Sequence, residues 1–79
     1  MKSQWHTLAY DPVRHCVWIV DQDGGRSVTN DAEAVVAEIN QRHPACRIIY
    51  RDTMGNWDEL RHRNGTFIGF APARDVLPP

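Results

Sequence analysis

The sequence predicts an α+β fold, a two-layer sandwich in the order ββαβββ with one helix on a mainly antiparallel sheet. Three observations predict it. The 79 residues are 42% apolar and 24% charged, which suits one small globular domain and leaves no room for a second. One stretch, between residues 31 and 42, has the apolar period of a helix. The runs on either side are short, apolar and bounded by Asp, Asn, Gly and Pro, as strands are.

The chain begins with two expected strands, over residues 5–10 and 16–20. Asp11 and Pro12 favour a turn between them, so the two strands should form an antiparallel hairpin. Residues 21–25, with the sequence DQDGG, favour a second turn because Asp-Gly and Gly-Gly steps suit positive φ. Residues 26–29 are then expected to return as a short strand.

The helix is expected over residues 31–42. Asn30 and Glu33 have the spacing of a capping box, in which each side chain binds a free backbone N–H group of the first turn. Pro44 should end the helix, because the residue before a proline is pushed out of the helical conformation. Four apolar residues recur at the spacing i, i+3, i+4, i+7 and should form the buried stripe: Ala32, Val35, Val36 and Ile39.

Three further strands are expected over residues 46–51, 57–63 and 66–70. Asn64-Gly65 predicts a two-residue type I′ turn between the last two, since both residues tolerate positive φ. Simple alternation places Phe67 on one face of the last strand and Phe70 on the other. Residues 71–79 contain three prolines and no periodicity, so we expect a single domain over 1–70 and an extended tail over 71–79.

Composition excludes several classes of protein. The formal net charge is −1, with 9 basic and 10 acidic residues, which does not suit a general binder of nucleic acid or of anionic membranes. No apolar run approaches the roughly 20 residues of a membrane span. The first residues do not form a secretory signal, so we expect a cytoplasmic protein, of bacterial or phage type, with Cys16 and Cys46 reduced.

The residues that could support metal binding or catalysis lack the necessary spacing. His15-Cys16 and His43-x-x-Cys46 contain the side chains of a zinc site, but adjacent strand residues point to opposite faces. No nucleophile occurs in a known local motif with a histidine and a carboxylate. We therefore expect no metal, no cofactor and no enzymatic activity.

A helix about 10 Å across cannot cover five strands that span roughly 20 to 24 Å. Aromatic and arginine side chains should therefore remain on the helix-free face, a composition typical of protein interfaces. This predicts a non-catalytic protein-interaction or dimerisation module, with a second copy or another protein as its partner. A cover formed by the tail, a small-ligand groove, and weak RNA or DNA binding remain alternatives. The residues expected at the interface are Trp5, Trp18, Tyr50, Trp57, Arg47, Arg51 and Arg61.

Overall fold

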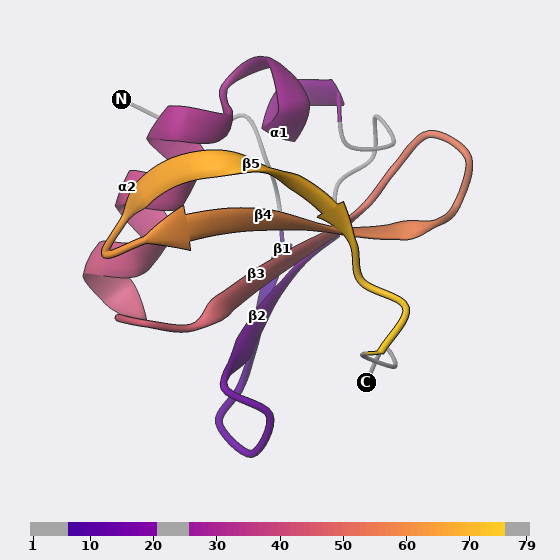
Figure 1. Cartoon of the computed structure of the whole chain (residues 1–79). Helices are drawn as coiled ribbons and strands as arrows, with labels where there is room; N and C mark the ends of the chain where they lie inside the picture. The colour runs from indigo at the N-terminus through magenta and orange to yellow at the C-terminus, as the bar shows by residue number, and fades with distance from the viewer. Residues whose placement is uncertain (1–6, 21–25, 76–79) are drawn as a thin grey trace.

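A computed structural model describes residues 7–20 and 26–75 (Figure 1). It confirms the predicted fold class, a five-stranded sheet with one main helix packed on it. The first expected strand is seen from residue 7, and its first two residues lie outside the described ones. The elements are β1 (Thr7–Asp11), β2 (Cys16–Val20), α1 (Arg26–Asn30), α2 (Ala32–Arg42), β3 (Arg47–Arg51), β4 (Trp57–Arg63) and β5 (Thr66–Pro72).

The strands lie in the sheet in chain order, from β1 to β5. Three of the neighbouring pairs are antiparallel, and β2 and β3 are parallel. A parallel pair needs a long crossover, and the segment that contains α1 and α2 supplies it. Both helices lie on the same side of the sheet, so the opposite side is the helix-free face (Figure 1).

The main core lies between α2 and the sheet. All four residues of the predicted helical stripe are buried, as the apolar period required. Leu60 in the middle of β4 is fully buried and lies opposite Ile48 of β3, so both strands contribute to this side. We call this the helix-side cluster, and its members are Val17, Ile19, Val28, Ala32, Val35, Val36, Ile39, Cys46, Ile48, Tyr50 and Leu60.

The expected strand at 26–29 is wrong, because α1 occupies these residues. Both edges of β2 are already paired, with β1 and β3, so a strand returning beside β2 has no free edge to join. A helical turn satisfies its backbone groups locally and buries Val28 completely. The Thr29 hydroxyl also donates a hydrogen bond to the Arg26 carbonyl (3.0 Å).

The capping box is wrong for a related reason. An N-cap residue needs a non-helical backbone, and Asn30 is the last residue of α1. Asp31 is the N-cap of α2 instead, and its side chain makes no capping hydrogen bond. The other end agrees with the prediction, since α2 ends at Arg42, two residues before Pro44.

The turn between β4 and β5 is confirmed. Asn64 and Gly65 have φ values of +52° and +88°, the two positive values that a type I′ turn requires. The alternation predicted for β5 is wrong, however, because the register shifts between Arg61 and His62 of β4. Phe67 lies opposite His62 and Phe70 opposite Leu60, so this bulge brings both phenylalanines to the helix side.

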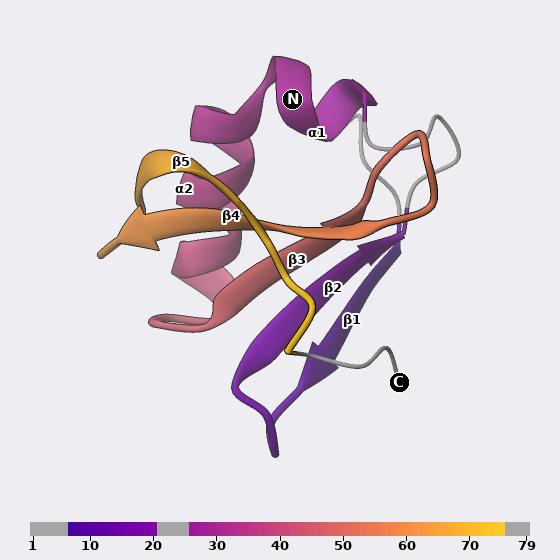
Figure 2. The same cartoon turned by 45° about the vertical axis from the view of Figure 1, so that its right-hand side comes forward.

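β5 also extends two residues beyond its expected end. Ala71 and Pro72 pair with Glu59 and Asp58, and the Ala73 N–H group donates a hydrogen bond to the Trp57 carbonyl (3.0 Å). The first part of the expected tail is thus continuous with the sheet. From there the chain turns and crosses the helix-free face (Figure 2).

Candidate interaction surface

The half of the helix-free face over β1, β2 and β3 is closed by the chain itself. Trp18 points to this side and is 1% exposed. Its ring packs against the Trp57 ring in a T-shaped arrangement, at a centroid distance of 5.2 Å and an interplanar angle of 87°. The closed half comprises Cys16, Trp18, Ile49 and Ala73, with Ala9 and Trp57 packed against them.

An ion-pair network holds the C-terminal segment over the closed half. The Arg47 guanidinium donates to both carboxylate oxygens of Glu59, with Nη2–Oε1 at 2.7 Å and Nε–Oε2 at 3.2 Å. It also donates to both oxygens of Asp75, with Nη1–Oδ2 at 2.9 Å and Nη2–Oδ1 at 3.2 Å. These bonds raise the pKa of Arg47 and lower that of Asp75. The Arg47 guanidinium is thus paired with two carboxylates of the chain itself.

The half of the same face over β4 and β5 is open. It contains a hollow of about 430 Å³, whose lining includes Arg61, Arg63 and Ile68. Among the described residues, neither Arg61 nor Arg63 has a hydrogen-bond or ion-pair partner. Ile68 is 60% exposed. We call these three residues, together with Gly69 opposite Arg61, the open half.

The wall of this hollow is fixed by His62. The Gly65 N–H group donates to its Nδ1 atom (3.1 Å), so the ring proton lies on Nε2 and is donated to the Cys46 carbonyl (2.8 Å). The ring thereby joins the β4–β5 turn to the start of β3.

The Cys46 thiol is buried, and burial raises the pKa of both cysteines. Both thiols are therefore held in their protonated, weakly nucleophilic form.

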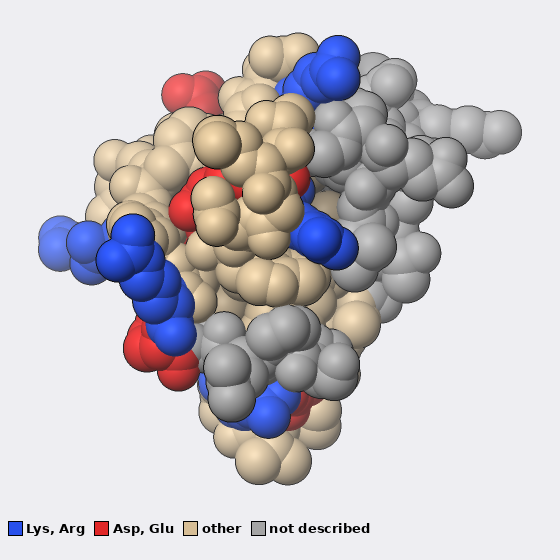
Figure 3. Space-filling model, turned by 90° about the vertical axis from the view of Figure 1, so that its right-hand side faces the viewer, with Lys and Arg blue, Asp and Glu red and all other residues tan. Residues whose placement is uncertain are grey.

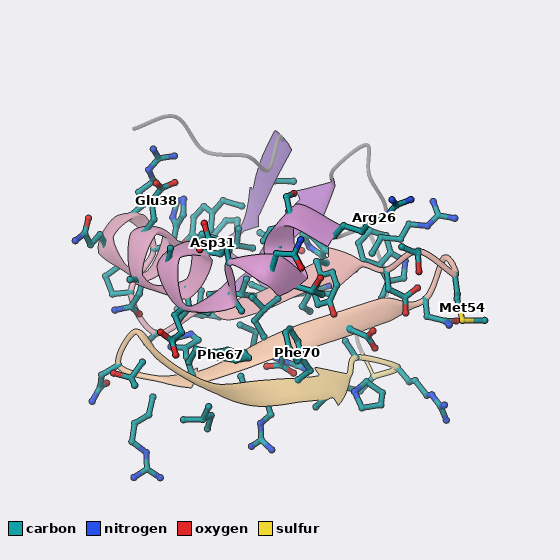
Figure 4. All side chains as sticks on the ribbon, turned by 90° about the horizontal axis from the view of Figure 1, so that it is seen from above. Arg26, Asp31, Glu38, Met54, Phe67 and Phe70 are labelled. Carbon is teal, nitrogen blue, oxygen red and sulfur yellow. The ribbon has the colours of Figure 1, made fainter. Side chains whose placement is uncertain are left out.

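The outer edge of β5 borders the open half, and no other described strand pairs with it. No residue of β5 is charged. Phe67 and Phe70 lie on the side of β5 that faces α2 (Figure 4), where Phe70 is 48% exposed. A second hollow of about 270 Å³ lies beside Phe67, under the junction of α1 and α2. Apolar side chains are thus exposed on both sides of this edge.

A pair of carboxyl groups, which the sequence analysis missed, lies at the loop between β3 and β4. The Asp52 Oδ1 atom accepts hydrogen bonds from the N–H groups of Asn56 (2.8 Å) and Met54 (2.9 Å), and the Asn56 bond contributes most to lowering the pKa of Asp52. Burial, with the hydrogen bond to Asp52, raises the pKa of Asp58. Burial and these carboxylates raise the pKa of Tyr50 to about 12. These contacts order the loop.

The predicted interface residues do not form one surface. Trp5 lies outside the described residues. Trp18 and Tyr50 are both buried, on opposite faces of the sheet, since Tyr50 belongs to the helix-side cluster. Trp57 is half-buried against Trp18.

The predicted arginines also separate. Arg51 is exposed at the end of β3, while Arg47 and Arg61 line the same hollow. The predicted interface residues did not include Arg63, Ile68 and Gly69. The available signal was the uncharged run from Thr66 to Pro72, but the bulge that fixes its side-chain directions is not evident from alternation.

The described surface has few of the features by which proteins bind RNA or DNA. On the face seen in Figure 3 the basic side chains do not form one continuous surface, because a group at the left is separated from the others by acidic and uncharged groups. Tyr50 is 4% exposed and cannot stack on a base. Continuous basic surface and exposed aromatic rings are the features that bind single strands.

Neither a metal centre nor a membrane span is seen in residues 7–20 and 26–75. Within these residues no group of three or more His, Cys, Asp or Glu side chains could hold a metal ion. No helix formed by them is long and apolar enough to cross a membrane.

Comparison of the chain with protein-family models, curated proteins and solved structures finds no match.

Proposed function

We propose that this protein is a non-catalytic interaction module that binds an extended segment of another protein along the outer edge of β5. The observation that carries the proposal is the uncharged edge itself, with Ile68 60% and Phe70 48% exposed on its two sides. Strand edges are normally protected by charge or cover, because their free N–H and C=O groups pair readily with another strand. Within the described part of the chain, β5 has only its bulge and Pro72 for protection.

An added strand would bind both the backbone and the exposed side chains of this edge. Main-chain hydrogen bonds to β5 would supply affinity, as in other modes of strand addition. The alternating side chains of the partner would cover Ile68 on one side and Phe70 on the other. Two hollows flank the edge, one beside Ile68 and one beside Phe67, so larger partner side chains have room on either face.

Charge favours a different protein over a second copy of this chain. β5 contains no acidic residue, so a symmetric β5–β5 pair would offer no carboxylate close to Arg61 and Arg63. It would also bring two such arginine pairs onto one continuous face. A partner with its own sequence can avoid this repulsion.

The experiment is a selection of random dodecapeptides displayed on phage against the full chain, followed by NMR titration of the enriched peptides. We expect peptides whose binding shifts the backbone amide signals of β5. The variant Ile68→Lys should lose binding, because a charge on an exposed edge opposes strand addition. Val13→Lys is the matched control, since Val13 is 90% exposed in the β1–β2 turn.

Two results would overturn the proposal. One is the absence of any enriched peptide, or of enriched peptides that perturb β5. The other is a wild-type dimer in sedimentation that Ile68→Lys converts to a monomer, because the occupant of the edge would then be a second copy.

A further inference from the structure

We infer that the segment bound at β5 is acidic, with a Glu or Asp beside Gly69 whose carboxylate pairs with Arg61. This inference rests on the proposed function, because it names the chemistry of the partner at that same edge. It begins from an imbalance of charge in the open half.

Several arginines of the chain already have carboxylate partners. Arg14, Arg42 and Arg47 each form an ion pair within the chain. Arg61 and Arg63 have no such partner among the described residues, although they lie two residues apart on one face of β4. Glu59, the nearest acid along that face of the strand, is held by Arg47 with both oxygens. The hollow therefore contains two cations whose charge the described chain leaves uncompensated.

The path from the outer edge to Arg61 is open at Gly69. Gly69 lies opposite Arg61 in the β4–β5 register, and its φ of +152° is a value that side chains rarely adopt. A Cβ atom placed there would meet nothing within 4 Å. No side chain of β5 therefore separates an added strand from Arg61 at this position.

The distances permit a direct ion pair. Neighbouring strands lie roughly 4.8 Å apart, so a strand beside β5 would have its Cβ atoms roughly 9.6 Å from those of β4. An extended arginine and an extended glutamate together span that distance. Their charge-assisted hydrogen bonds would be partly shielded from water by Ile68.

The faces of the added strand should therefore differ. The residue beside Gly69 is acidic, and its neighbours in sequence point to the helix side, where they cover Phe70. The expected motif is an acidic residue flanked by apolar residues, in an extended segment.

The test is a double-mutant cycle on the best peptide from the selection. We expect acidic residues to be enriched at one position, and Glu→Gln there to weaken binding to the wild-type chain by about three- to tenfold. The same peptide change should have no effect on binding to Arg61→Gln. Arg51→Gln removes the same charge from β3 and should leave the peptide effect intact.

The outcomes separate this inference from the proposed function. Peptides that bind at β5 without an acidic preference, or a Glu→Gln effect that persists in Arg61→Gln, would overturn the acidic partner and leave strand addition standing. Failure of every peptide to perturb β5 would overturn both.

Discussion

The two halves of the helix-free face differ in how far the chain itself covers them. Neither helix covers this face, yet Trp18 in the closed half is 1% exposed whereas Ile68 in the open half is 60% exposed. The chain closes the first half with Ala73 and with the ion pairs of Arg47. In the second half, Arg61, Arg63 and the outer edge of β5 have no partner among the described residues. The difference separates the part of the face that packs within the fold from the part that the proposed partner would use.

The largest effect should come from opening the closed half at its centre. Trp18→Ala removes the largest fully buried side chain and should cost about 3 to 5 kcal/mol of unfolding free energy. Trp57→Ala should cost less, because Trp57 is only half-buried. Urea denaturation measures both values.

Trp18→Phe is the matched control for this prediction. It keeps an aromatic ring and removes the indole N–H, which has no hydrogen-bond acceptor among the described residues. Trp18→Phe should therefore lower the unfolding free energy less than Trp18→Ala does. Equal losses for Trp18→Ala and Trp57→Ala would show that the closed half is not a packed core.

A smaller loss of unfolding free energy is expected when the ion pairs that hold the C-terminal segment over the closed half are removed. Arg47→Gln leaves the half-buried Glu59 carboxylate without its cation and should cost about 1 to 2 kcal/mol in urea denaturation. Arg51→Gln serves as the control on the same strand, because no carboxylate of the described residues pairs with Arg51. If Arg47→Gln lowers the unfolding free energy no more than this control does, the structural role of the network is contradicted.

The same network predicts a pH dependence of stability. Hydrogen bonds from Arg47 hold the pKa of Asp75 below its ordinary value of 3.8 in the folded chain. Asp75 therefore contributes stability above pH 3.8, and this contribution is lost as the pH falls through the lowered folded-state pKa. The stability difference between wild type and Asp75→Asn should shrink over that acidic range. It should be absent at every pH in an Arg47→Gln background, and a difference that persists there would assign the effect to another group.

The smallest effect on stability is expected in the open half. Ile68→Lys should change the unfolding free energy by no more than about 0.5 kcal/mol, because the side chain is already exposed. This makes the variant suitable for binding studies. A large loss of stability in thermal denaturation would place Ile68 in the fold and weaken its assignment to an interaction surface.

Local patterns explain which parts of the fold were predictable. The stripe ending at Val36 and Ile39 follows from helical period, and the Asn64-Gly65 turn follows from backbone preference. The strand expected at 26–29 failed because the occupied edges of β2 are a property of the whole sheet.

The candidate surface was harder to predict because its determinants are distant in sequence. Arg47 and Asp75 are 28 residues apart, and nothing in either local sequence indicates that they meet. The prediction placed Trp18 and Tyr50 together on the helix-free face, but they lie on opposite faces of the sheet. Alternation also could not show that Ala73 would cover Trp18. The register shift at Arg61 redirected the side chains of β5, which alternation alone cannot reveal.

Amide hydrogen exchange of the full chain with a selected peptide compares the two outer strands, β1 and β5, directly. β1 is the other edge of the described sheet and serves as an internal control. We predict that saturating peptide slows exchange at amides of β5 and leaves those of β1 unchanged, and that Ile68→Lys abolishes the protection. Protection at β1, or unchanged exchange at β5 while the peptide is bound, would contradict a binding site at this edge.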